Sequence, residues 1–394
     1  MRRKSILVFF PHNFYEMSAG CHRRFYQLLC YFKDSGFSVD LLSINGFTNR
    51  WNAEDFKRND FFDTVRVCEW RPSGEEKLDI ESRWREGRLR DFAILPLRKE
   101  FNEMARRRHY DFVLISYAYW ANLSDEFGSD VVKIIDLHDF ITLNLYISIG
   151  RGIFKFGRMF EEEIKAISKF NFALSISEEE TLALSPFCPE TKFVNAPIFF
   201  EPKFKKDSGH EFDLLFVGSD NPFNREGMSW FMKDIYPLLS PTVRIAVVGD
   251  VCKILNKKDN MVLIPHTDDL DEIYNRTNLA FCPLRGGTGL KVKVVEALSY
   301  GIPVITTSWG LSGIIQKYDN GCIIADNAKD FAKTVLYLLN NGEEYLSLKH
   351  KAESFFLRHF SSEACRTKLD KIFLDPSCLT NSAASTLHIK EEEK

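Results

Sequence analysis

The stretch at 278–307, NLAFCPLRGGTGLKVKVVEALSYGIPVITT, determines the fold that the sequence predicts. It has the pattern of a strand, a glycine-rich loop, a helix and a second strand. An apolar run at 278–283 precedes the loop RGGTG, whose glycines allow the backbone to turn tightly. Apolar residues then recur at helical spacing over 290–300, and a second apolar run follows at 302–306. This order is typical of a parallel α/β sheet.

The start of this helix has the features of a phosphate-binding site. A helix that follows glycines presents unpaired N–H groups and a partial positive charge at its first turn. Lys291 and Lys293 add two full positive charges there, and Glu296 places a carboxylate one turn further along. The alternative is a plain crossover helix with two solvated lysines. The combination of glycines, basic first turn and carboxylate favours a site for a diphosphate.

The run GGTGLKVKVVEALSYGIPVITT resembles the donor-site signature of the retaining glycosyltransferases of family 4, which have the two-domain GT-B fold. It is most similar to the subgroup written G-x-G-[TL]-[RK]-x-K-x-x-E-A-x-x-x-G-x-P-V. The resemblance implies that the loop and its basic residues hold the diphosphate of a nucleotide sugar, and that Glu296 binds the ribose hydroxyls. The loop and helix residues of that predicted cradle are Gly287, Thr288, Gly289, Leu290, Lys291 and Lys293.

Two positions depart from the family pattern. Many members carry a second glutamate eight residues before the first, in contact with the donor sugar, and this chain has Thr288 there. Pro265 and His266 stand in a loop where family members commonly have a glycine and read the nucleotide base by backbone groups. The resemblance therefore leaves the sugar and the base of the donor open.

Length and composition are those of a globular protein with room for two domains. The chain has 394 residues, of which 45% are hydrophobic and 27% charged, and its formal net charge is −3. This balance argues against a nucleic-acid-binding protein. The nine cysteines are scattered singly, without metal-ligand spacing. We therefore expect reduced thiols in a cytoplasmic protein, no bound metal and no cofactor.

The chain starts with MRRKSILVFFPHN, which is basic and then apolar, as a signal peptide would be. The apolar run is short and ends at Pro11, so we expect a first buried strand at 5–10 instead. No stretch reaches the ~20 apolar residues that a membrane-spanning helix requires.

The segments 5–10, 23–33 and 37–44 read as strand, helix and strand, which predicts a first parallel-sheet domain. The loop after its first strand lacks G-x-G-x-x-G, and the chain contains no G-x-x-x-x-G-K-[ST]. Neither a dehydrogenase nor a P-loop NTPase is therefore supported. By the resemblance, this loop faces the donor, with Gly20 and Arg23 near the helix start.

The most basic part of the chain also lies in the first domain. Residues 45–74 read as polar and irregular apart from one short helix, whereas 78–109 combine many arginines with apolar residues. One interpretation of 83–108 is a peripheral contact at the inner membrane face, or a site for an anionic lipid-linked acceptor. The other is an amphipathic helix with a solvated outer face, because acidic residues occur in the same stretch.

A predicted strand at 131–136 ends in Asp136-Leu137-His138-Asp139. Polar side chains at the carboxyl end of a parallel strand point into the crevice where such sheets bind ligands. In the family that the chain resembles, a histidine in a similar D-x-H-D segment contacts the donor sugar near the reacting centre. We therefore predict His138 and Asp139 as catalytic residues. The alternatives are a hydrogen-bonded structural histidine and a helix-capping aspartate.

A second domain is predicted to begin with the buried strand 212–217, which ends in Gly218 and is followed by a helix at 227–239. A glycine-terminated strand opposite a helix start is again a surface suited to phosphate, and Arg225 would add positive charge there. The expected boundaries are an acceptor-side domain at 1–197, a linker at 198–210, a nucleotide-sugar-binding domain at 211–355, a helix returning to the first domain at 356–375, and a flexible tail at 376–394.

These features predict two Rossmann-like α/β domains that face a cleft with a nucleotide-sugar site. The implied reaction is retaining transfer of a sugar from a nucleotide-diphosphate donor to a saccharide, lipid-linked or protein acceptor, in bacterial-type polysaccharide or glycoconjugate assembly. Two alternatives stay open, a sugar-nucleotide epimerase and a non-catalytic nucleotide-sugar-binding partner. The one plain Asp-x-Asp, at 269–271, precedes a helical pattern and is explained by capping, so we predict transfer without a metal.

Overall fold

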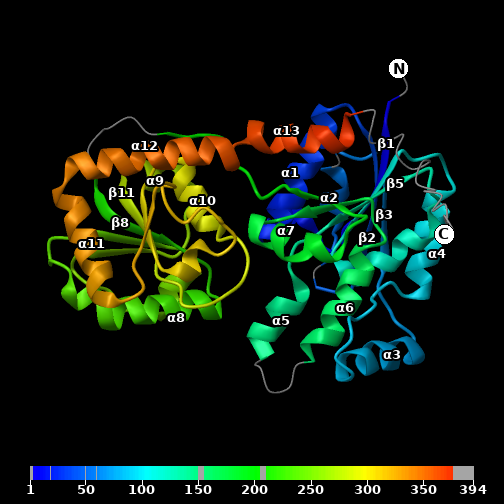
Figure 1. Ribbon diagram of the computed structural model, residues 1–394, viewed down its shortest axis with the longest axis horizontal. Coiled ribbons are helices and arrows are strands. Elements are labelled where there is room, and N and C mark those ends of the chain that lie inside the picture. Colours follow the sequence, from blue (N-terminus) through cyan, green and yellow to red (C-terminus); the bar gives the residue numbers. More distant parts are fainter. Residues whose placement is uncertain are drawn as a thin grey trace, which may run out of the picture.

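The computed structural model describes residues 3–17, 19–48, 50–58, 60–149, 155–204 and 210–375. It consists of two α/β domains side by side, each built on a parallel sheet with helices on its faces (Figure 1). The predicted fold class, two Rossmann-like domains of GT-B type, is confirmed. Residues 205–209 of the predicted linker and the predicted tail at 376–394 lie outside the described residues.

The N-terminal domain has a seven-stranded sheet in the order β3-β2-β1-β4-β5-β6-β7, with parallel neighbours throughout. The order reverses between β1 and β4. Both of these strands are buried at every position, because helices cover the two faces. The strands are β1 Ser5–Phe9, β2 Ser38–Asn45, β3 Thr64–Glu69, β4 Phe112–Ser116, β5 Val132–Asp136, β6 Phe172–Ser175 and β7 Lys192–Asn195.

Aromatic side chains fill the core on both faces of this sheet. Phe9 packs against Trp120 with ring centroids 5.0 Å apart, and its neighbour Phe10, on the other face, stacks on Phe25 at 4.1 Å. The surrounding helices are α1 Gly20–Asp34, α2 Ala53–Lys57, α3 Gly74–Arg85, α4 Leu95–Ala105, α5 Ile141–Ile149, α6 Phe156–Ile167 and α7 Glu178–Leu184, with 3-10 segments η1 Phe14–Glu16, η2 Ala118–Glu126 and η3 Ser185–Phe187.

The C-terminal domain has a six-stranded sheet in the order β10-β9-β8-β11-β12-β13, also with parallel neighbours, and its order reverses between β8 and β11. The strands are β8 Phe212–Val217, β9 Ile245–Val248, β10 Met261–Ile264, β11 Thr277–Cys282, β12 Val304–Thr306 and β13 Cys322–Ile324. The helices are α8 Pro222–Trp230, α9 Leu270–Asn275, α10 Val292–Ser299, α11 Ala328–Asn340 and α12 Gly342–His359, with shorter segments η4 Phe231–Ile235, η5 Tyr236–Leu238, η6 Asp250–Ile254 and η7 Ser308–Leu311.

The chain returns to the first domain at its C-terminal end. Phe200, beyond β7, donates its N–H to the carbonyl of Phe360 at 3.1 Å and accepts from the N–H of Ser362 at 3.2 Å, so the two crossings between the domains lie side by side. Helix α13, Ser362–Phe373, then packs on the N-terminal domain (Figure 1). There Phe373 contacts Phe32 with ring centroids 4.9 Å apart. This helix fastens the second domain to the first.

Two segments fold differently from the pattern read in the sequence. The region 45–74, expected to be irregular, contains the edge strand β3, which pairs in parallel with β2 although a charged residue separates its two valines. The helix after β8 was expected from Gly227 but begins at Pro222. Asn221 caps it by accepting the N–H of Asn224 at 2.9 Å, and proline suits the first helical position.

The basic region 83–108 forms the end of α3, the connection to α4, and α4 itself. Its arginines have acidic partners within the domain: Arg83 lies 2.7 Å from Asp79, and Arg98 lies 2.7 Å from Asp91. This pairing favours the interpretation as a solvated outer face, and the membrane contact stays a prediction. In the described part of the chain, no helix combines the length and the hydrophobicity needed to cross a membrane.

Candidate functional site

The segments that follow the carboxyl ends of β5, β8 and β11, and the start of α1, line one cleft between the two domains. Ligands of α/β sheets bind where the strand order reverses, outside the carboxyl ends of the strands. A cleft of about 480 Å³ lies at the β8/β11 reversal and is closed on its other side by the start of α1 and the loop after β5. The predicted site residues that line it are Gly20, Asp139, Gly218, Gly287, Thr288, Leu290, Lys291, Lys293 and Glu296.

The glycine loop between β11 and α10 forms one wall of the cleft. Gly287 and Gly289 have φ angles of 95° and 71°, in the left-handed region that glycine adopts without steric cost. The backbone N–H groups of 287–293 donate to no acceptor within the described chain. Because the positive end of α10 lies at the same place, these N–H groups form a surface whose charge and unpaired donors suit an anion.

Lys291 shapes the loop from within. Its Nζ donates to the carbonyl oxygens of Gly287, Thr288 and Gly289 at 3.0, 2.8 and 3.1 Å. Gly289 itself is not among the cleft-lining residues, and it contributes through this carbonyl. Burial lowers the pKa of Lys291 to about 8. The ammonium therefore fixes the curvature of the loop and places positive charge behind its amides.

Lys293 points across the cleft towards α8. Its Nζ donates to Oδ1 of Asn224 at 2.6 Å and lies 4.0 Å from the centroid of the Phe216 ring. Burial lowers the pKa of Lys293 to about 8, because the charged form loses hydration without gaining a carboxylate partner. A half-buried ammonium with one neutral hydrogen-bond acceptor is a group that a bound anion would stabilise.

Glu296 lies on α10, one turn beyond Lys293, with its side chain 13% exposed. The hydroxyl of Tyr274 donates to its Oε2 at 3.3 Å, and Arg23 from the other domain brings Nη1 within 3.8 Å of its Oε1. Burial raises the pKa of Glu296, and Arg23 and Tyr274 oppose that shift. The carboxylate is thus held at the cleft wall by groups from both domains.

His138 follows the end of β5 and is 6% exposed. It lines a second pocket of about 250 Å³, which shares Gly20 and Asp139 with the cleft. Its ring stacks on Tyr117 with centroids 4.3 Å apart, and its Nε2 lies 3.0 Å from Oδ2 of Asp136. These contacts fix the ring in one orientation.

Asp136 is fully buried and paired with Arg24 of α1. Its Oδ1 accepts hydrogen bonds from Nε and Nη2 of Arg24 at 3.0 and 2.6 Å. Burial alone would raise the pKa of Asp136, but Arg24 and His138 together hold it well below its usual range. The ionised carboxylate therefore joins α1 to the histidine at the end of β5.

Asp139 is half-buried and lines both pockets. Burial raises the pKa of its carboxyl group, and His138 opposes the shift. The fully buried Glu163 of α6 accepts the N–H groups of Ile141 and Thr142, each at 2.8 Å. Glu163, rather than Asp139, therefore accepts the hydrogen bonds of the first backbone N–H groups of α5. These bonds fix the backbone directly after Asp139.

Of the predicted residues outside the glycine loop, Gly20 and Gly218 line the cleft and Arg225 does not. A β carbon at Gly20 would lie 3.7 Å from Val292 across the cleft, whereas one at Gly218 would lie 2.7 Å from the Phe216 ring. Arg225 is not among the cleft-lining residues, because its Nη2 donates to Asp220 at 2.6 Å on the exposed side of α8. The structure therefore does not bring Arg225 to the cleft.

The Asp-x-Asp segment has structural partners. Asp269 caps α9 by accepting the N–H of Glu272 at 2.9 Å, and Asp271 accepts from Nζ of Lys203 at 2.7 Å. Among the residues that the structure describes, no group of three or more histidine, cysteine or acidic side chains could hold a metal ion.

Several residues of the cleft had no role predicted from the sequence. Phe223 and Asn224 at the start of α8 and Asn144 of α5 line it, and Tyr274 of α9 supports Glu296. The glycine-terminated strand before α8 was a signal for the first two. Asn144 and Tyr274 carry no local signal, because their place in the cleft depends on how the helices pack.

Two facing parallel sheets, with a helix N-terminus opening into the cleft between them, define the class of two-domain proteins with the GT-B fold. Residues 211–341 match the family model described as glycosyl transferases group 1. A Klebsiella pneumoniae protein described as an uncharacterized 44.6 kDa protein in the cps region is 24% identical over 305 residues, which cover 68% of this chain and 77% of that protein.

Two further proteins are similar to this chain, one over part of its length and one over nearly all of it. An uncharacterized glycosyltransferase of Haemophilus influenzae is 25% identical over 166 residues, 38% of this chain and 46% of that protein. The crystal structure of Anabaena Alr3699/HepE in complex with UDP and glucose has the same fold. Its TM-score is 0.65 at 12% identity, with 94% of this chain and 99% of that chain covered.

Proposed function

We propose that this chain is a retaining glycosyltransferase that transfers a sugar from a nucleotide-diphosphate donor to an acceptor hydroxyl in polysaccharide assembly. The observation that carries the proposal is the set of unpaired N–H groups at 287–293, with Lys293 beside them, in a cleft lined by both domains. The match of 211–341 to glycosyl transferases group 1 and the relative from a cps region support the activity and its setting. The resemblance of 286–307 to the donor-site signature supports family 4 and retention as part of the proposal.

In the proposed complex, the diphosphate lies on the loop amides between Lys291 and Lys293, and the ribose lies against Glu296. The complex of Anabaena HepE with UDP and glucose supports a nucleotide sugar as the donor class. Negative charge grows on the diphosphate as the bond to the sugar breaks. Donors that are already oriented towards that charge stabilise the transition state without reorganising. Lys293 and the start of α10 are such donors, and the Lys291 ammonium, which donates to the loop carbonyls, adds positive charge behind the loop.

The sugar end of the donor would extend towards the pocket of His138 and Asp139, which adjoins the cleft. Asp136 and Tyr117 hold the His138 ring in place, so its free edge can contact the sugar. Asp139 offers a carboxylate at the boundary of the two pockets. We assign both residues to the reacting centre.

The glutamate on α10 provides a direct test of donor placement. Glu296→Gln keeps the size of the side chain but removes its charge, and a charge-assisted hydrogen bond is worth roughly 1.5–3 kcal/mol. We expect UDP, measured by calorimetry, to bind more weakly by that amount. Glu272→Gln on the exposed face of α9 is the matched control and should bind UDP as the unaltered protein does. Equal affinity of Glu296→Gln and the unaltered protein would contradict the ribose assignment.

Turnover is expected to be independent of divalent metal. Asp269 and Asp271 are occupied by the α9 amide and by Lys203, and the proposed diphosphate position already has two ammonium groups nearby. Rates measured in excess EDTA should therefore equal rates with added magnesium or manganese. A loss of activity in EDTA that metal restores would contradict this assignment of the diphosphate cradle.

One experiment separates the proposed activity from its alternatives. Purified protein is incubated with a panel of nucleotide-diphosphate sugars, with and without an extract that contains saccharide and lipid-linked acceptors. A transferase releases nucleoside diphosphate in proportion to glycosylated acceptor. An epimerase converts the donor without acceptor, and a non-catalytic partner binds the donor without turnover.

The setting of the reaction is part of the same proposal. The cysteines in the described chain are free thiols, in keeping with a cytoplasmic protein. A peripheral contact with the inner membrane face through 83–108 would bring the protein to a lipid-linked acceptor. Flotation with anionic vesicles tests that contact.

A further inference from the structure

Another hollow lies on the N-terminal domain, outside the cleft and the pocket of His138. It has a volume of about 290 Å³ and lies between the end of α3, the connection to α4, η2 and the second half of α6. We call it the arginine pocket, because cationic side chains dominate its wall. The polar members that matter here are Arg83, Arg88, Arg90, Tyr119 and Lys169.

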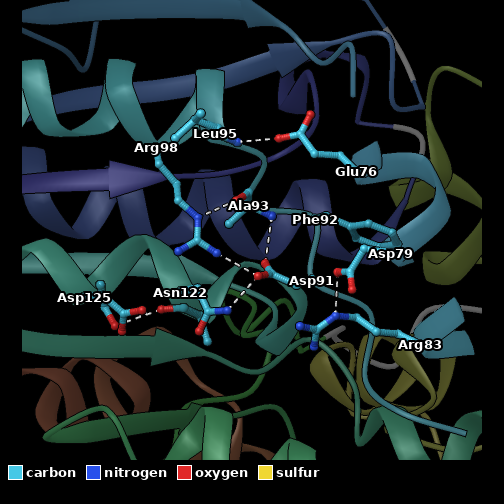
Figure 2. Close-up of polar contacts among 12 residues, drawn as sticks. Glu76, Asp79, Arg83, Asp91, Phe92, Ala93, Leu95, Arg98, Asn122 and Asp125 are labelled. Atoms are coloured by element: carbon cyan, nitrogen blue, oxygen red, sulfur yellow. Dashed lines mark hydrogen bonds and ion pairs between the residues drawn. The ribbon is translucent and has the colours of Figure 1, made fainter. Parts of the chain in front are cut away.

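Most charges around the arginine pocket are already neutralised. Arg83 pairs with Asp79, and Lys169 pairs with Asp125 at 2.8 Å. The carboxylate of Asp91 is fully engaged: it accepts from Nη2 of Arg98 at 2.7 Å, from Nδ2 of Asn122 at 2.7 Å and from the N–H of Ala93 at 3.0 Å (Figure 2). Arg88 is likewise paired with Glu162. These carboxylates are therefore not available to a further cation.

Arg90 is the exception among the cations of the wall. It makes no ion pair and no hydrogen bond with any residue that the structure describes, and its Nε is buried. Its guanidinium lies over the ring of Trp84, with 4.1 Å between the guanidinium carbon and the ring centroid. Stacking holds the guanidinium in place but satisfies none of its N–H donors. A buried donor left without a partner is costly, and an anion would supply the missing acceptor.

Tyr119 lines the arginine pocket. It follows β4 by three residues, and its neighbour Tyr117 stacks on His138. Burial raises the pKa of the Tyr119 phenol, the carboxylates of Glu163 and Asp139 raise it further, and Arg90 opposes them. The Tyr119 hydroxyl therefore lies within electrostatic reach of both Arg90 and the proposed catalytic Asp139. The hydroxyl donates to no acceptor among the described residues. An oxygen atom of a ligand in the pocket would accept this hydrogen bond.

We propose that the arginine pocket binds the anionic group of an acidic acceptor saccharide, a carboxylate or a phosphate carried by one sugar unit. The volume lies near the lower end of the roughly 300–1,000 Å³ typical of ligand pockets, which suits one sugar unit rather than a long chain. Arg90 forms the charged contact and Tyr119 adds a neutral hydrogen bond. The inference rests on the proposed function, since it names the class of acceptor.

The test uses soluble probes in the absence of nucleotide: glucuronic acid, glucose 6-phosphate and neutral glucose, followed by saturation-transfer NMR. The two acids should bind the unaltered protein, and Arg90→Gln should weaken them at least tenfold. Neutral glucose should not compete with them. Arg85→Gln is the matched control, because Arg85 is exposed at the end of α3, five residues before Arg90, and pairs with Glu81. Tyr119→Phe, which removes only one hydroxyl, is a second variant that leaves the core volume unchanged and should weaken both acids.

UDP affinity distinguishes failure of this inference from failure of the proposed function. Arg90→Gln should bind UDP as the unaltered protein does. If neither the unaltered protein nor any variant binds UDP, that result would count against the proposed transferase function itself. Equal binding of the acids by Arg90→Gln would overturn the inference. So would binding of anionic phosphatidylglycerol vesicles, lost in Arg90→Gln, with no binding of the soluble acids. That result would assign the pocket to lipid headgroups.

Discussion

Replacement of Lys293 by alanine is expected to lower kcat/KM for the sugar donor by about 10²–10³-fold, the usual effect of removing one positioned donor from a developing negative charge. Both kcat and KM should change, because the diphosphate is charged before the reaction and gains charge during it. UDP affinity should fall as well. The geometric basis is the short contact of Nζ with Asn224 at 2.6 Å, which aims the ammonium into the cleft.

Two comparisons make this result specific. Lys333→Ala, on the exposed face of α11 in the same domain, should leave donor kinetics unchanged. His138→Ala should lower kcat with a smaller effect on UDP binding, because its pocket lies beside the proposed diphosphate position. If Lys293→Ala binds UDP and turns over as the unaltered protein does, the lysine has no part in the site.

The pH dependence offers an independent check on the same group. Burial lowers the pKa of Lys291 and Lys293 to about 8. Above that pH the free enzyme loses the positive charges that would meet the diphosphate, so kcat/KM should decline as pH rises through 8. Below pH 8 both ammonium groups are present and this contribution is complete.

Arg24→Ala is expected to destabilise the protein by about 3–5 kcal/mol, since it leaves the carboxylate of Asp136 buried without its cation. Arg24 and Asp136 are joined by two hydrogen bonds to Oδ1, and both side chains are almost fully enclosed. The free energy of unfolding from urea titration measures the loss. Arg23→Ala is the matched control: the same substitution one position earlier removes a half-exposed contact of 3.8 Å with Glu296, worth ~0–1 kcal/mol.

Acid should reduce the difference between Arg24→Ala and the unaltered protein. Arg24 and His138 hold the pKa of Asp136 below its usual range, against the effect of burial. The stability that this ionised carboxylate contributes is present above its unfolded pKa of about 3.9 and is lost as pH falls through the folded pKa. Without Arg24, burial favours the protonated acid, so the variant is penalised less as pH falls. A pH-independent difference would show that lost packing, rather than the buried charge, causes the effect.

Some parts of the cleft followed from local pattern. The order strand, glycine loop, helix, strand at 278–307 appears as β11, α10 and β12, because apolar periodicity and glycine torsions act within a few residues of the chain. His138 stands at a strand end for the same reason. The pattern failed for β3, which has too few apolar residues to stand out. Its neighbour β2 supplies the ladder that makes it a strand.

By itself, the sequence determined the fold class, the glycine cradle and the identity of the basic and acidic residues on α10, since backbone torsion and helical periodicity are local properties. Only the tertiary structure decided how those groups are used. In the folded protein, Lys291 donates to the carbonyls of its own loop, and Arg23 and Tyr274 contact Glu296. Arg225 pairs with Asp220 outside the cleft, and Arg90 has no acidic partner among the described residues. Such pairings depend on distances between segments far apart in the chain, and those distances are set by packing.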